Sequence, residues 1–119
     1  MTRAAKNGGD EATAGLEEGT PHYHGHRERL RARFREAGPD SVADYELLEL
    51  VLFRAIPQRD VKPLAKALIE AFGSFAEAIS APETRLREIK GLGDAAITEI
   101  KVVQAAASRL ARGQVKARK

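Results

Sequence analysis

The chain has 119 residues, of which 43% are hydrophobic, and its 20 basic and 17 acidic side chains give a net charge of +3. This length supports a single folded domain, and the absence of cysteine excludes disulfides, thiolate zinc sites and cysteine nucleophiles. There is no apolar core of a signal peptide and no run near the ~20 apolar residues of a membrane span, so we expect a cytoplasmic protein that does not enter membranes.

Charge and glycine are distributed unevenly along the chain. Residues 1–21 contain four glycines, scattered charges and one large aliphatic side chain besides the first methionine, so we predict a disordered tail. The net charge is +3 over 21–36, −3 over 37–60 and +5 over 82–119. Two basic blocks around an acidic middle suit a nucleic-acid surface, although charge runs are more often simply solvated.

A first helix is predicted over residues 27–36, ended by a Gly-Pro pair at 38–39. Leu30 and Phe34 lie one turn apart and form its apolar face. Its alternating arginines are Arg27, Arg29, Arg31, Arg33 and Arg35. They are spread around the helix, so only about three of them can meet one DNA backbone. We expect Arg27 and Arg31 to make secondary DNA contacts; the alternative is a solvated helix face.

Three histidines, His22, His24 and His26, alternate just before this helix. In an extended segment, alternate side chains lie on one side and can share a metal ion. No carboxylate or cysteine accompanies them, so we expect no metal site. The segment is expected to lead into the first helix and to add positive charge near DNA below about pH 6.5.

A second helix is predicted to begin at a cap on Ser41 or Asp44. It is apolar around most of its girth, which predicts a place at the centre of the core. Basic residues follow it, at Arg54, Arg59 and Lys62. If residues 44–72 are a degenerate copy of the glycine-containing unit described below, these three side chains would make further secondary DNA contacts.

Two more helices are predicted from caps and apolar spacing. Asp60 is expected to cap the third helix, which ends at Gly73. Ser74 and Glu77 have the spacing of a capping box and start a short fourth helix. No segment alternates with a period of two, so the predicted fold class is all-α, a compact domain of five or six helices.

The most informative stretch is a Gly-Leu-Gly turn at residues 91–93. Ser80 and Glu83 repeat the capping-box spacing and predict a helix that reaches Ile89 before the turn, and apolar spacing predicts a long helix after it. Such a turn leaves the first amides of the second helix uncovered for an anion. The letters also fit a dinucleotide-binding fingerprint, but that fold needs a strand before the first glycine, so we expect no cofactor.

Helix, Gly-x-Gly turn and helix, over about residues 82–111, resemble the helix-hairpin-helix DNA-binding motif. The resemblance implies that backbone amides hold a DNA phosphate without reading bases, with lysines adding charge nearby. The residues that would do so are Lys90, Gly91, Leu92, Gly93 and Lys101. Asp94 departs from the pattern, because its carboxylate could cap the free amides and repel a phosphate. A self-capped structural turn is therefore the alternative.

Several segments together resemble the amino-terminal region of RadC-type (UPF0758) proteins. These segments are residues 22–30, 44–50, 55–65, 72–75 and 90–93. The resemblance implies a helical domain over 22–112, a basic linker or tail at 113–119 and an association with DNA repair. Members of this family continue into a JAB/MPN-like metal-binding domain. The resemblance therefore implies that any metal-dependent hydrolase activity lies outside this chain, and we expect no catalytic residues in it.

Two functions of different class remain open from the sequence. The first is a DNA-binding module that contacts the phosphates of duplex or branched DNA. The second is a protein-interaction or structural helical domain, such as a regulatory partner of a metal-dependent hydrolase domain.

Overall fold

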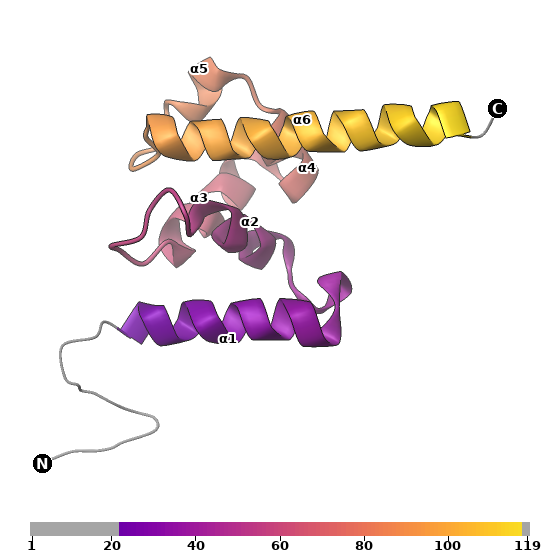
Figure 1. Cartoon of the computed structure of the whole chain (residues 1–119). Helices are drawn as coiled ribbons and strands as arrows, with labels where there is room; N and C mark the ends of the chain where they lie inside the picture. The colour runs from indigo at the N-terminus through magenta and orange to yellow at the C-terminus, as the bar shows by residue number, and fades with distance from the viewer. Residues whose placement is uncertain (1–21, 118–119) are drawn as a thin grey trace, which may run out of the picture. The chain divides into compact units, whose positions relative to one another are not determined.

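A computed structural model describes residues 22–117 (Figure 1). The chain divides after Ala32 into two compact units, and each is described by itself. The described residues form six α-helices and one short 3-10 helix and contain no strand, which confirms the predicted all-α class. The predicted disordered tail, residues 1–21, lies outside the described residues.

Helix α1, His22–Ala37, begins five residues earlier than predicted and ends just before Gly38, as predicted. The ring of Tyr23 meets the ring of His24 edge-on, and the guanidinium of Arg27 lies 5.3 Å from the centroid of the Tyr23 ring. Tyr23 and Arg27 are one helical turn apart, and pairs at this spacing stabilise helices. This contact helps to explain why the histidine segment is helical.

The helical conformation corrects the geometry expected for the histidines. Residues two apart on a helix point about 200° apart, whereas the shared-metal geometry needs an extended segment. His24 and His26 therefore do not lie on one side. No group of three or more potential metal-ligand side chains is found within residues 22–117.

The second unit contains the remaining helices. They are α2 (Asp44–Leu52), α3 (Lys62–Phe72), α4 (Phe75–Ser80), α5 (Glu83–Leu86) and α6 (Asp94–Ala117), preceded by the 3-10 helix Pro39–Ser41. Helix α2 packs against α3, α4 and α6, and α4 also packs against α3 and α6. The large side chains that are fully buried include Leu48, Leu52, Leu68, Leu86 and Ile100. Helix α2 therefore lies at the centre of this core, as its sequence predicted.

The start of α2 differs from the prediction. Neither Ser41 nor Asp44 caps it; the cap position is Ala43, whose amide donates to Oε1 of Glu46 at 2.9 Å. The carboxylate of Asp44 instead accepts the amide of Phe75 at 2.9 Å, at the first residue of α4. The side chain of the first residue of α2 thus accepts an amide at the N-terminus of α4, a contact that no local pattern predicts.

The next two helices begin and end nearly where predicted. The predicted cap of α3 is one residue off: Val61 holds the cap position without a side-chain cap bond, while Oδ1 of Asp60, the residue before it, accepts the amide of Lys62 at 3.0 Å. Gly73, with φ of +104°, follows the last residue of α3. Ser74 caps α4, with its Oγ accepting the amide of Glu77 at 3.1 Å.

Helix α5 is shorter than expected and its predicted cap is wrong. Ser80 is the last residue of α4, and Pro82 occupies the cap position of α5 without a side-chain hydrogen bond. After the buried Leu86, amides bond to carbonyls three residues back, as from Ile89 to Leu86 at 3.1 Å. This tighter pattern ends the α-helix before the glycines.

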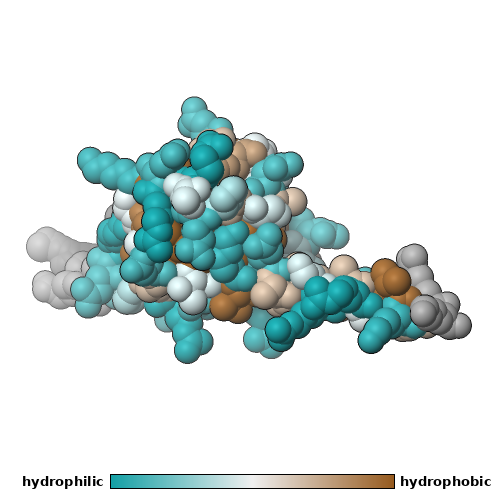
Figure 2. All heavy atoms as spheres, turned by 90° about the horizontal axis from the view of Figure 1, so that it is seen from above, coloured by the Kyte–Doolittle hydropathy of each residue, from teal (hydrophilic) through white to brown (hydrophobic). Residues whose placement is uncertain are grey.

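Helix α6 has two different halves. Ala96, Ile97 and Ile100 are buried, whereas residues 105–117 are all exposed. The apolar stripe predicted to continue along the helix therefore leaves the core; Leu110 is 64% exposed. Figures 1 and 2 show this half projecting, with hydrophilic and hydrophobic residues mixed on its surface. No helix among the described residues combines the length and apolarity needed to cross a membrane.

Candidate functional site

The candidate site is built on residues 87–93, here called the glycine turn, which join α5 to α6. Gly91 has φ of +93°, a conformation that glycine adopts without strain. The amide of Leu92 donates to the carbonyl of Ile89 at 3.1 Å, and the Leu92 side chain is buried. The turn is thus closed by a backbone hydrogen bond and anchored by an apolar side chain, while Lys90, Gly91 and Gly93 are exposed.

The first turn of α6 opens directly from the glycine turn. The amide of Ile97 donates to the carbonyl of Gly93 at 3.0 Å, so Gly93 holds the cap position. The first four amides of an α-helix have no partner inside the helix. Here they belong to residues 93–96, and none makes a backbone hydrogen bond to another described residue. Together with the helix dipole, these amides favour a negative charge at this end of α6.

Asp94 is engaged by a cation and not by these amides. Its Oδ1 accepts a hydrogen bond from Nη1 of Arg87 at 2.5 Å. This hydrogen bond, and the negative charge of Asp94, raise the pKa of Arg87 above its ordinary value. Within the described residues, Asp94 makes no hydrogen bond with a backbone amide. The guanidinium of Arg87, at the other end of the glycine turn, therefore holds the Asp94 carboxylate and partly neutralises its charge.

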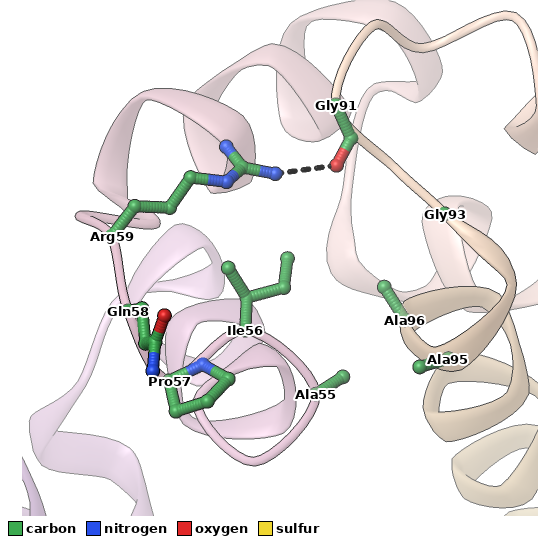
Figure 3. Close-up of a pocket in the computed structure, with 9 residues that line it drawn as sticks. All are labelled: Ala55, Ile56, Pro57, Gln58, Arg59, Gly91, Gly93, Ala95 and Ala96. Atoms are coloured by element: carbon green, nitrogen blue, oxygen red, sulfur yellow. Dashed lines mark hydrogen bonds between the residues drawn. The ribbon is translucent and has the colours of Figure 1, made fainter.

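Arg59 brings a second segment to the same place. It lies in the connection between α2 and α3, and its Nη2 donates to the carbonyl of Gly91 at 2.6 Å (Figure 3). A Cβ atom on Gly91 would stand 3.3 Å from the same nitrogen. A residue predicted as a secondary contact thus touches a residue of the predicted primary contact, 32 positions later in the sequence.

A hollow of about 390 Å³ lies between this connection and the start of α6. Its lining residues are Ala55, Ile56, Pro57, Gln58, Arg59, Gly91, Gly93, Ala95 and Ala96. In Figure 3 the Arg59 side chain crosses one side of the hollow to reach Gly91, and the methyl groups of Ala95 and Ala96 point toward the connection. The walls are mainly apolar, with one guanidinium at the edge.

Lys101 lies elsewhere than predicted. Its amine donates to the carbonyl of Ala81 at 2.5 Å, to that of Ile79 at 3.3 Å and to Oε1 of Gln104 at 3.1 Å. It is also about 10 Å along the helix axis from Asp94, at about 1.5 Å per residue. The amine therefore donates hydrogen bonds to carbonyls at the end of α4 and does not lie beside the glycine turn.

The remaining predicted contacts are divided between the two units. Arg54 is exposed in the connection after α2, and Lys62 is half-buried at the start of α3. Arg27 and Arg31 lie on the part of α1 that belongs to the first unit, so they are not assigned to this site. The sequence reasoning missed Arg87. Its seven-residue separation from Asp94 is not a helical spacing, and the contact depends on how the turn folds back.

The comparisons with known proteins identify the family of this chain. The family model described as UPF0758 N-terminal matches residues 24–98, which include the whole glycine turn and the first residues of α6. Because the match covers more than half of the chain, this helical protein belongs to the UPF0758 N-terminal family.

The curated proteins provide a near relative. A UPF0758 protein of Ruegeria pomeroyi is 54% identical over 90 residues, which are 76% of this chain and 40% of the relative. The chain thus spans about 40% of the length of the curated relative that it matches. No solved structure matches the chain.

Proposed function

We propose that this chain binds the phosphates of duplex or branched DNA without reading sequence, using the glycine turn and the start of α6 as a helix-hairpin-helix motif. The observation that carries the proposal is the run of amides at residues 93–95, which belong to exposed residues and have no backbone partner among the described residues, beside the guanidinium of Arg59. Amides and cations of this kind hold a phosphate oxygen but carry no information about bases.

The surrounding charges support the same proposal. Lys90 is exposed next to Gly91, and Arg87 partly neutralises the acid at the start of α6. The association with DNA repair implied by the RadC-type resemblance belongs to this proposal, and it makes branched DNA a suitable ligand to test. Lys101 is left out of the proposed contact, because its amine is bound to carbonyls of α4 and the residue after it.

The first test is a fluorescence-anisotropy titration with duplex, single-stranded and three-way-junction DNA at about 50 and 200 mM salt, a range over which phosphate contacts change affinity strongly. We expect salt-sensitive binding that Lys90→Glu weakens. The slope of log affinity against log salt should become smaller by about one, because one phosphate contact is lost.

The matched control is Lys116→Glu, which makes the same change of charge at an exposed position near the end of α6. It should retain most of the affinity. Equal losses in both variants would show attraction by net charge alone. Absence of binding to all three DNAs at the lower salt would contradict the proposal and favour the protein-interaction alternative.

Asp94→Asn should strengthen DNA binding several-fold, because it removes a negative charge from the proposed phosphate site while keeping the shape of the side chain. Arg87→Gln should have the opposite effect, since it leaves the Asp94 carboxylate without its cation. The same titration measures both.

Asp40→Asn is the control for Asp94→Asn, because it removes one exposed acid outside the site. It should change the affinity less than Asp94→Asn does. Equal effects of the two substitutions, or no effect of Asp94→Asn, would mean that the amides of α6 do not face the phosphate.

A second candidate function rests on the exposed apolar side chains along α6 after its buried first turns. Val102, Leu110 and Val115 are 57%, 64% and 61% exposed. Exposed apolar residues on one projecting helix suit contact with another protein surface, such as a metal-dependent hydrolase domain. Association through such a surface should depend weakly on salt, which separates it from phosphate binding.

A further inference from the structure

We infer that the hollow between the α2–α3 connection and the start of α6 receives the base of an unpaired nucleotide, so that the chain prefers DNA containing one over continuous duplex. This inference rests on the proposed function, since the glycine turn must hold the neighbouring phosphate. It adds a ligand class, an exposed purine or pyrimidine ring, that phosphate contacts do not select.

The first argument is the chemistry of the walls. A hollow of about 390 Å³ falls in the range of small-molecule sites. Ala55, Ile56 and Pro57 form one wall, and Ala95 and Ala96 form the other. A nucleobase has apolar faces that suit such walls.

The second argument is the guanidinium at the edge. Arg59 is both a lining residue of the hollow and the donor to the Gly91 carbonyl, so its planar group is held in place before any ligand arrives. Bases stack on guanidinium planes as they do on aromatic rings. A group already fixed by one hydrogen bond loses little further freedom when a base stacks on it.

The third argument is position. Gly93 and Ala95 line the hollow and also contribute amides to the proposed phosphate site. A nucleotide whose phosphate lies on those amides therefore has its base next to the hollow. A paired base is held in the stack and cannot enter, so the site selects a nucleotide that is already unpaired.

Charge favours nucleic acid over protein as the occupant. The connection carries Arg54 and Arg59 against one acid, Asp60, and Lys62 follows it as the first residue of α3. The turn on the other side exposes Lys90. An aromatic side chain of a protein would fit the walls equally well, but it would not bring the negative charge that these cations complement.

The test compares a continuous duplex with the same duplex carrying a one-nucleotide bulge of 2-aminopurine, using the full chain. We expect the bulged DNA to bind roughly tenfold more tightly, the order of one base stacking interaction. Its 2-aminopurine fluorescence should also change on binding. Ala55→Leu, which fills the hollow from the connection, should abolish both the preference and the fluorescence change while leaving the affinity for continuous duplex within about twofold.

Ala105→Leu is the matched control, the same substitution at an exposed position of α6 beyond the core, and it should keep the preference. If circular dichroism shows that Ala55→Leu has lost helix, Pro57→Leu adds a branched side chain without an aromatic ring to the same wall from an exposed position, and it should likewise abolish the preference.

The outcomes separate the two proposals. Equal affinity of the unchanged protein for both DNAs, or a preference that survives filling of the hollow, overturns this inference and leaves salt-sensitive duplex binding intact. Failure to bind any DNA at low salt overturns the proposed function as well, and turns attention to an aromatic peptide in the hollow.

Discussion

Leu48→Ala should lower the free energy of unfolding by about 3 kcal/mol, within the ~2.7–5 kcal/mol range of buried leucine truncations. Leu48 is 0% exposed and lies on α2, the helix that packs against α3, α4 and α6. Removing three carbons there leaves a cavity that rigid neighbours fill only in part. Urea denaturation followed by circular dichroism measures the change as a shift in midpoint at constant slope.

Leu110→Ala is the matched control, because Leu110 is 64% exposed on the projecting half of α6. Its effect should stay within about 0.5 kcal/mol, as for other surface substitutions. A loss as large as that of Leu48→Ala would mean that this half of α6 is covered in solution, which would support the protein-interaction alternative.

Gly91→Ala should lower the free energy of unfolding by about 2 kcal/mol. With φ of +93°, an L-residue at this position costs roughly 1–2 kcal/mol in backbone strain. The new Cβ would also stand 3.3 Å from Nη2 of Arg59, which must shift and weaken its bond to the Gly91 carbonyl. The same urea titration measures the effect.

Gly113→Ala tests whether that loss comes from the glycine turn. Gly113 lies within α6, and a Cβ there would meet nothing within 4 Å. Alanine is the better helix former, so this substitution should raise stability by roughly 0.5–1 kcal/mol. If both glycine substitutions changed stability in the same direction, the positive φ of Gly91 would not be what sets its cost.

Together these substitutions measure separately how much stability comes from the core around Leu48 and how much from the glycine turn. The core around Leu48 holds α2 and α6 together, and α2 leads into the connection that carries Arg59. The glycine turn then places uncovered amides next to that guanidinium. Binding measurements on variants of the turn are therefore meaningful only beside an unfolding curve for each variant.

The sequence by itself predicted the elements that depend on neighbouring residues. The all-α class, the central second helix, the end of α3 at Gly73 and the cap of α4 at Ser74 are all confirmed. Each depends on apolar spacing or on a side chain within a few positions of the amide it meets. The resemblance to RadC-type proteins is likewise confirmed as membership of the UPF0758 N-terminal family. The DNA contacts inferred from it stay predictions.

Only the tertiary structure decided the contacts between distant residues. Asp44 accepts the amide of Phe75 at the start of α4, Arg59 donates to the carbonyl of Gly91, and Lys101 donates to a carbonyl at the end of α4. Each polar group had several partners compatible with its local sequence, and the packing of α2 against α3, α4 and α6 selected among them. Local spacing predicts which segments are helical, because helical hydrogen bonds span only four residues. The hollow and the guanidinium beside the glycine turn exist only once segments more than thirty residues apart have packed together.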